Sequence, residues 1–229
     1  MTTRVVLRSA AVLCVLALPG LAGADQIQLT DTLPGTFIDI SGIGTDLQLG
    51  DEGFAEITST IGNALLPAGP VVISNNGGIA FNAADPILAP LNEPIPSMSA
   101  FGGGQALLGY WDDIGNDIGG VYYYQSDNAL IVQWDNRLVG DVRITFQIQI
   151  FDASEVTNPY FQFLYQDISG AGGGASATIG YQDGGAGYND SQWSYNTAGA
   201  VADGSVLSVI PEPGAALLML PGVLALRRR

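Results

Sequence analysis

Lysine and histidine are absent from this chain of 229 residues, and cysteine occurs once, as Cys14. Without histidine there is no imidazole base, no Ser-His-Asp triad and no histidine-ligated zinc. Without lysine there is no Schiff base and no Walker-type P-loop. Seven arginines stand against 22 acidic residues and leave a net charge of −15. This balance opposes binding to nucleic acid, whose phosphates require clustered basic side chains.

The arginines are concentrated at the two ends of the chain. Arg4 and Arg8 lie near the start, three arginines close the sequence, and only Arg137 and Arg143 lie between. All 22 acidic residues lie between positions 25 and 212. The ends are therefore different in character from the acidic middle, and each end carries its own signal.

The first end has the order of a secretory signal peptide. Arg4 and Arg8 provide a short positive region, and residues 10–21 are mostly apolar but too few to span a membrane. Ala22 and Ala24 place small residues at the −3 and −1 positions of a cleavage site after residue 24. We expect residues 1–24 to be removed after export through the Sec translocon, and the only cysteine with them. The alternative is a buried N-terminal helix.

The other end carries a tripeptide, a hydrophobic segment and a basic tail. The tripeptide is Pro211-Glu212-Pro213, residues 214–226 are almost entirely apolar, and Arg227, Arg228 and Arg229 end the chain. This order over residues 211–229 resembles the PEP-CTERM sorting signal of Gram-negative bacteria. The resemblance implies that an exosortase, a membrane transpeptidase-like enzyme, recognises Pro211, Glu212 and Pro213.

The length of the hydrophobic segment decides what kind of membrane contact it makes. Thirteen residues of helix rise about 20 Å, whereas a hydrocarbon core is about 30 Å thick. The terminal arginines resist translocation and act as a membrane stop. We expect a short hydrophobic helix with a transient membrane association, and the alternative is a buried terminal helix.

Residues 25–210 have the pattern of β-structure. Residues 142–151 alternate strictly between apolar and polar side chains, which predicts a half-buried strand. Further strands are expected at residues 36–40, 55–60, 70–74, 78–82, 120–125, 129–134, 161–165 and 177–182. Asn- and Gly-rich turns separate them, and four prolines make residues 84–96 a loop. The sequence predicts an all-β domain, an antiparallel β-sandwich, flanked by the signal peptide and the short C-terminal helix.

A series of short blocks in this domain follows a recognisable order. They are Leu108-Gly-Tyr-Trp-Asp-Asp113, a strand ending in Trp134, Ile144-Thr-Phe-Gln-Ile-Gln-Ile150, Phe161-Gln-Phe-Leu-Tyr165 and Ala177-Thr-Ile-Gly-Tyr-Gln182. Over residues 36–183 the succession resembles the nidogen-like (NIDO-type) extracellular domain and its bacterial relatives. The resemblance implies a non-catalytic extracellular module with adhesive or matrix roles.

The most concentrated group of oxygen ligands is Asp112, Asp113, Asn116 and Asp117. Oxygen atoms at this spacing suit Ca²⁺, although the EF-hand spacing is absent. Paired carboxylates also serve as acid and base in glycoside hydrolysis, but neighbouring residues on a strand point to opposite faces. The third alternative is turn capping without any ligand. Asp183 and Asp190 carry a weaker form of the same pattern.

Aromatic residues that stack on sugars are the other candidate. The set is Tyr122, Tyr123, Tyr124, Trp134, Tyr160, Tyr165, Tyr181, Tyr188, Trp193 and Tyr195. In β-proteins such side chains commonly pack in the core or across strands, and the sequence does not separate the two roles.

The sequence thus predicts an exported, non-enzymatic protein of the cell surface or extracellular matrix. Its expected partners are the exosortase and Sec translocon during export, and exopolysaccharide or other surface proteins afterwards. No cofactor is expected apart from the Ca²⁺ considered above. The alternatives are a Ca²⁺-dependent carbohydrate-binding module and a secreted hydrolase.

Overall fold

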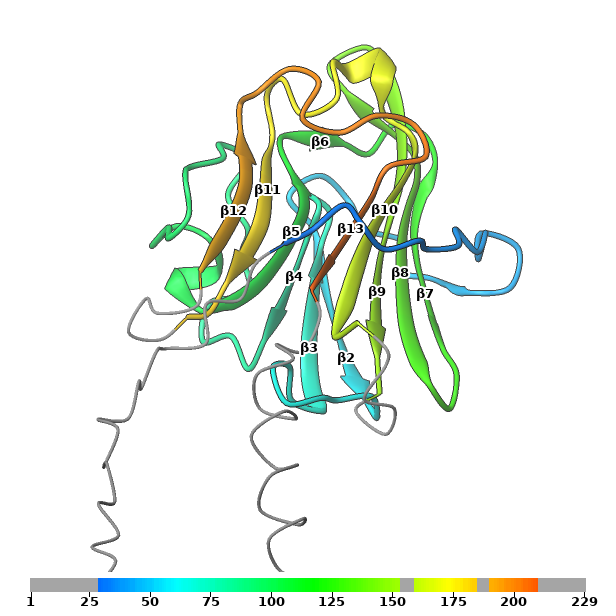
Figure 1. Cartoon of the computed structure of the whole chain (residues 1–229), viewed down its shortest axis with the longest axis vertical. Coiled ribbons are helices and arrows are strands. Elements are labelled where there is room, and N and C mark those ends of the chain that lie inside the picture. Colours follow the sequence, from blue (N-terminus) through cyan, green and yellow to red (C-terminus); the bar gives the residue numbers. More distant parts are fainter. Residues whose placement is uncertain (1–28, 153–158, 185–189, 210–229) are drawn as a thin grey trace, which may run out of the picture.

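The computed structural model describes residues 29–152, 159–184 and 190–209 of the chain. These residues form two antiparallel sheets facing each other, with only two short 3₁₀-helices, η1 (Phe101–Gly103) and η2 (Ser169–Ala171) (Figure 1). The predicted all-β antiparallel sandwich is therefore confirmed. The predicted signal peptide and C-terminal helix lie outside the described residues.

The larger sheet, here sheet A, has the strand order β1-β7-β8-β9-β10-β13, with β6 paired to β8. Its strands are β1 (Thr45–Asp46), β6 (Ile114–Gly115), β7 (Gly120–Gln125), β8 (Ala129–Val139), β9 (Val142–Phe151), β10 (Phe161–Asp167) and β13 (Val206–Val209). The strand predicted at residues 142–151 has the same bounds in the structure.

The second sheet, sheet B, has the order β12-β11-β5-β4-β3-β2. Its strands are β2 (Phe54–Ser59), β3 (Gly69–Ser74), β4 (Gly78–Phe81), β5 (Gln105–Trp111), β11 (Thr178–Gln182) and β12 (Ser191–Tyr195). The expected strand at residues 36–40 is not formed, because that segment pairs with no strand and crosses the outside of sheet A instead.

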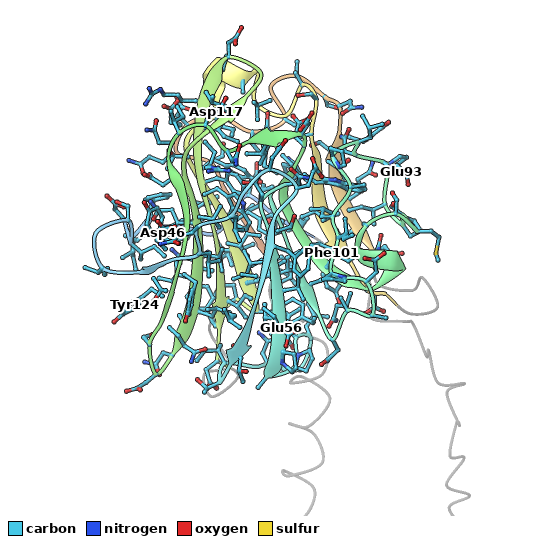
Figure 2. The ribbon with its side chains drawn as sticks, turned by 180° about the vertical axis from the view of Figure 1, so that it is seen from behind. Asp46, Glu56, Glu93, Phe101, Asp117 and Tyr124 are labelled. Carbon is cyan, nitrogen blue, oxygen red and sulfur yellow. The ribbon has the colours of Figure 1, made fainter. Side chains whose placement is uncertain are left out.

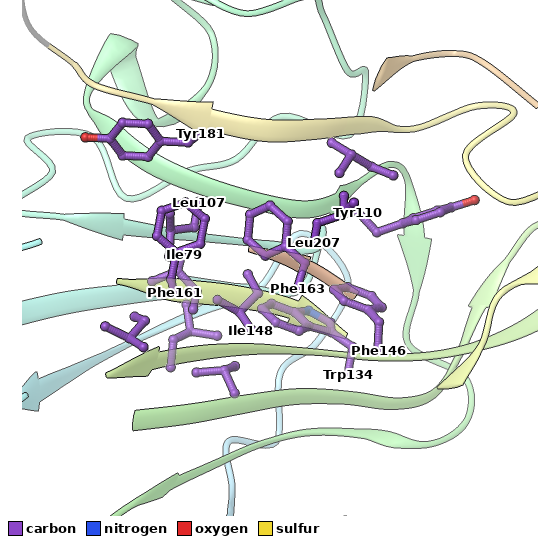
Figure 3. Packing of buried hydrophobic residues seen from close by; sticks show 14 of the residues in the cluster. Ile79, Leu107, Tyr110, Trp134, Phe146, Ile148, Phe161, Phe163, Tyr181 and Leu207 are labelled. Atoms are coloured by element: carbon purple, nitrogen blue, oxygen red, sulfur yellow. The ribbon is translucent and has the colours of Figure 1, made fainter. Parts of the chain in front are cut away.

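The space between the sheets is filled by large aromatic and β-branched side chains (Figure 3). Trp134 and Phe146 stack with ring centroids 4.8 Å apart and planes 5° apart. The indole N–H of Trp134 donates to the carbonyl of Ser74, 3.0 Å away, so a side chain of sheet A is anchored on the end of β3 in sheet B. Burial and hydrogen bonding together fix how the sheets face each other.

β5 lacks simple alternation because it contains a bulge. The amides of Gly109 and Tyr110 both donate to the carbonyl of Gly77. Leu107 and Tyr110 consequently face the core, whereas Leu108 and Trp111 belong to a second apolar cluster. Gly77 is required here, because it has φ +84° and a Cβ would lie 2.0 Å from the carbonyl oxygen of Tyr110.

Residues 34–40, which we call the strap, cross the outer face of sheet A over β8, β9 and β10. The strap is held by buried glutamines of β8, β9 and β10, namely Gln133, Gln147, Gln149 and Gln162. Three of their side-chain amides donate to carbonyls at alternate strap positions, Pro34, Thr36 and Ile38. Gln147 and Gln133 accept the amide protons of Ile38 and Ile40. The polar face of β9 is therefore buried at Gln147 and Gln149 but not at Arg143, which is exposed, so the half-buried strand expected from the alternation is corrected only for the part under the strap.

The outer face of sheet B is covered by residues 84–104, which we call the cover. The cover inserts Leu88 and Phe101 among apolar side chains of β3, β4 and β5 and so makes the second cluster. Trp111 also donates its indole N–H to the carbonyl of Ala89, 2.6 Å away. Figure 2 shows Phe101 and Glu93 on the opposite side of the molecule from Asp46 of sheet A.

Candidate functional site

The predicted oxygen ligands lie at the end of the sandwich where β5 passes into β6. Asp112 and Asp113 join these two strands, and Asn116 and Asp117 follow β6. Asp112 is 8% exposed, and its carboxylate accepts the hydroxyl of Ser176 and the amide of Asp113. Burial raises the pKa of Asp112 above its ordinary value. Asp112 is therefore a structural side chain that braces the turn.

Asp113 faces a different group of side chains. Its carboxylate lies with those of Asp51 and Glu52, with one oxygen from each within 4.8 Å of the others, and all three residues are exposed. Burial raises the pKa of Glu52, and the neighbouring charges of Asp51 and Asp113 add to the rise. The structure thus separates Asp113 from Asp112 and joins it to the turn that precedes β2.

A buried asparagine, Asn76, holds one member of the cluster formed by the carboxylates of Asp51, Glu52 and Asp113. Asn76, which is fully buried, donates from its side-chain amide to Glu52 and to the carbonyl of Leu88, both at 2.9 Å. Its side-chain oxygen accepts the amide of Ile114 at 3.3 Å. One side chain therefore ties together the turn before β2, the cover and the start of β6.

A buried cation lies close to this acidic end. Arg137, on β8, is 2% exposed and donates to the side-chain oxygen of Asn75. Burial lowers the pKa of Arg137, and the nearby charges of Asp46, Asp51 and Asp117 oppose that change. The positive guanidinium thus partly neutralises the nearby carboxylates, which reduces the electrostatic attraction of this end of the domain for a metal cation.

The remaining predicted ligands do not join the group by any contact among the described residues. Asn116 lies beside Gly50, where a Cβ would come 3.8 Å from its side-chain nitrogen. Asp117 contributes a charge near Arg137. Asp183 and Asp190 meet elsewhere, where the Asp190 carboxylate accepts the amide of Asp183 at 2.8 Å. Within residues 112–117, Asp112 therefore braces the turn and Asp113 joins the carboxylates of Asp51 and Glu52. Asn116 and Asp117 lie near Gly50 and Arg137.

Sequence reasoning identified Asp113 but missed Asp51 and Glu52. The turn at residues 50–53 is visible in the sequence, yet nothing local connects it with position 113. The pairing arises because β2 and β5 belong to one sheet whose loops meet at the same end.

Three of the ten aromatic candidates are core residues, while Tyr122, Tyr123 and Tyr160 are only partly buried. Trp134, Tyr165 and Tyr181 are at most 2% exposed, while Tyr124 and Tyr195 are each 38% exposed. Burial raises the pKa of Tyr165 and Tyr181 far above the ordinary value, so both phenols stay protonated. Tyr188 lies outside the described residues. Trp193 is partly exposed on β12, the edge strand of sheet B.

Comparison with known proteins gives one match. A family model described as NIDO related matches residues 67–216, well over half of the chain. The match overlaps most of the range predicted to resemble a nidogen-like domain and extends beyond it. No curated protein and no solved structure matches the chain.

Within the described parts of the chain, no helix has the length and apolar character needed to cross a bilayer. Domains of the matched family are typically extracellular. On the extent of the family match, the chain belongs to the nidogen-related (NIDO-related) family.

Proposed function

We propose that this is an exported, non-enzymatic protein of the cell surface or exopolysaccharide matrix, sorted by an exosortase through Pro211-Glu212-Pro213. The observation that carries the proposal is the order of tripeptide, hydrophobic segment and terminal arginines at the end of the sequence. Family membership supports it, because a nidogen-related domain indicates an extracellular setting. Arg227, Arg228 and Arg229 hold the end of the tail on the cytoplasmic side until it is processed.

The chemistry of the domain supports a non-enzymatic role. The chain has no histidine and no lysine, and the two carboxylates that could have formed an acid–base pair engage different neighbours. Burial raises the pKa of Tyr110 to about 12, so this phenol is not a base at neutral pH. Among the described residues, the polar side chains with raised pKa values are explained by burial in the fold.

The fold suits a load-bearing or adhesive module. Two sheets with covered outer faces form a unit that does not depend on a disulfide, since the only cysteine precedes the expected cleavage site. The acidic domain keeps the protein soluble in a hydrated matrix. We expect adhesion or matrix contact through the exposed surface after the ends are processed.

The test is mass spectrometry of the protein isolated from its native host. We expect a mature N-terminus at Asp25 and a C-terminus at or near residues 211–213. Replacing all three residues of the tripeptide by alanine should leave the tail in place. Glu56 is an exposed acidic residue on β2, and the control variant Glu56→Ala should be processed as the parent is. An intact Arg229 on surface-anchored protein would overturn the sorting proposal.

The Ca²⁺-dependent and hydrolytic alternatives stay predictions with their own tests. If Ca²⁺ binds, Asp51 and Glu52 are further candidate ligands, because their carboxylates lie close to that of Asp113. Calorimetric titration with Ca²⁺, repeated on Asp113→Asn, tests the first alternative. A turnover screen with alanine at Asp112 and Asp113 tests the second, and unchanged turnover removes that pair as its site.

A further inference from the structure

An open cleft of about 500 Å³ lies between the edges of the two sheets. One wall is formed by residues 31–35 together with β13, and the other by β12 and the turn that follows it. Thr30 pairs with Ser208 of β13 and so holds the first wall together, and the amide of Leu29 donates to the hydroxyl of Ser191 on β12, which joins the two walls. The cleft is therefore part of the fold, although it lies at the edge of the sandwich.

Trp193 supplies the aromatic surface of the cleft. Its indole N–H donates to the carbonyl of Ala200 at 2.9 Å, which fixes the orientation of the ring. The ring packs against the main core but stays partly exposed, and it lines the cleft. Trp111 and Trp134 are both fully buried, so Trp193 alone among the three tryptophans offers ring surface to a ligand.

Polar side chains line the same cleft as that ring. Asp31 is exposed and, among the described residues, is the only charged one that lines the cleft. Thr32 adds a hydroxyl, whose oxygen lies 2.8 Å from the hydroxyl oxygen of Thr30 in a hydrogen bond. The hydroxyl oxygen of Ser205 accepts the amide of Ala202 at 2.9 Å, which leaves its proton free to donate. The described lining of the cleft thus presents an apolar ring, a carboxylate acceptor and hydroxyls, and it includes no basic side chain.

These features match one class of ligand. A pyranose ring has an apolar face of C–H groups and a rim of hydroxyls, and aromatic side chains with a polar surround are the usual complement to such amphipathic groups. A carboxylate accepts strong, charge-assisted hydrogen bonds from neighbouring hydroxyls. A uronate or phosphate would instead face the charge of Asp31, and no basic side chain in the described part of the chain lines the cleft to compensate for it. The volume admits one or two sugar residues.

We propose that this cleft binds a neutral pyranose residue of a polysaccharide, with Trp193 as the stacking surface and Asp31 as the hydroxyl acceptor. The proposal rests on the proposed matrix function and names the ligand class that such a function would use. It needs no metal, and it places the contact on the edge of the sandwich rather than at the acidic end.

The test uses tryptophan fluorescence of the mature protein with acrylamide as quencher. Maltohexaose and cellohexaose are the neutral probes, hexagalacturonate the acidic one, and tetralysine the basic peptide. We expect a neutral hexasaccharide to reduce the quenching of tryptophan fluorescence by acrylamide. The Trp193→Phe variant should not show this protection. Asp31→Asn should weaken that binding about tenfold, as expected for one charge-assisted hydrogen bond. Asp127→Asn, in the exposed turn between β7 and β8, is the matched control and should bind as the parent does.

Three results would overturn the proposal. They are no protection by either neutral hexasaccharide, equal or stronger protection by hexagalacturonate, and protection by tetralysine that exceeds the sugars and is lost in Asp31→Asn. Because Trp193→Phe removes an indole hydrogen bond, Asp31→Asn provides the test if that variant does not fold. Terminal processing in the host separates the two proposals. Normal processing without sugar binding rejects the cleft alone, and sugar binding without processing rejects the sorting function alone.

Discussion

The two sheets have their outer faces covered in chemically different ways. The strap lies on sheet A through hydrogen bonds between glutamine side chains and its backbone, whereas the cover on sheet B inserts apolar side chains into a second cluster. A hydrogen bond contributes about 0.5–1.5 kcal/mol net because it replaces one to water. Burial of a large apolar side chain contributes about 1.5–3 kcal/mol. The cover should therefore supply stability, while the strap supplies register.

The spacing of the glutamines sets the register of the strap. Gln133 lies directly across from Gln147, and Gln149 directly across from Gln162, so the glutamines form a lattice on adjacent strands. The amide of Gln147 also donates to Gln133 at 2.7 Å. Such a lattice accepts an extended backbone in one alignment, since a shift by one residue would leave buried amides without partners.

The largest effect should come from removing the aromatic anchor of the cover. Phe101 is 1% exposed and belongs to the second cluster. Phe101→Ala should destabilise the domain by about 3–5 kcal/mol, because a buried cavity is added to the lost transfer free energy. Urea unfolding followed by circular dichroism measures the change.

Phe54→Ala is the matched control for that variant. Phe54 lies on the edge strand β2 and is 45% exposed, so its loss should cost much less. Equal destabilisation by the two variants would show that the cover is not a second core.

A smaller effect is expected when the lattice under the strap is broken. Gln147→Leu keeps the approximate volume but leaves the amide and carbonyl of Ile38 without their side-chain partner. We expect a loss of about 1–3 kcal/mol, the usual cost of a buried polar group left unpaired. Hydrogen exchange should show faster opening at Ile38 before the rest of the sheet is affected.

Gln192→Leu provides the reciprocal control. The side-chain oxygen of Gln192 accepts the amide of Ile95 in the cover at 2.8 Å. This variant should accelerate exchange at Ile95 and leave Ile38 unchanged. Faster exchange at Ile38 in both variants would contradict the view that the strap and the cover are held independently.

The fold could be predicted where alternation is undisturbed, as in β9. β5 was missed because its bulge places Leu107 and Tyr110 on one face and removes the period of two. The strand expected at residues 36–40 was wrong for a different reason. An extended segment was correctly recognised, but its partners are side chains rather than a neighbouring strand.

The candidate sites could be predicted only as far as local sequence reaches. Residues 112 and 113 are adjacent, yet the bulge and the following turn give them separate neighbours. Trp193 stood in a list of ten aromatics, and its role depends on where the chain brings residues 31–35. Contacts between residues 160 positions apart carry no signal in a single sequence.

Acid should weaken the strap slightly. The side-chain amide of Gln133 donates to Asp39 at 3.0 Å, and this hydrogen bond holds the pKa of Asp39 below 3.8. A carboxylate with a lowered folded-state pKa stabilises the fold above its unfolded value and loses that contribution as the pH falls through the folded value. The stabilisation should therefore be complete above about pH 4 and decline below it.

Asp39→Asn should remove this dependence. After correction for intrinsic rates, hydrogen exchange at the amide of Ile40 should accelerate below pH 4 in the parent but not in the variant. This acceleration should be smaller than the one that Gln147→Leu causes at Ile38. Asp127→Asn is the control, and it should follow the parent. A parent and Asp39→Asn protein with parallel pH profiles would remove Asp39 from the attachment of the strap.

The smallest effect should come from the apolar side chains that the cover leaves outside. Leu91 and Met98 are 79% and 80% exposed, so neither contributes to the second cluster. Leu91→Ser and Met98→Ser should each change the free energy of unfolding by no more than about 0.5 kcal/mol. Comparison of these two variants with Phe101→Ala shows whether the stability depends on burial of an apolar side chain or only on its being apolar. A loss from either serine variant approaching that of Phe101→Ala would mean that these side chains are covered in solution, and sedimentation velocity would then identify self-association of the cover face as the cause.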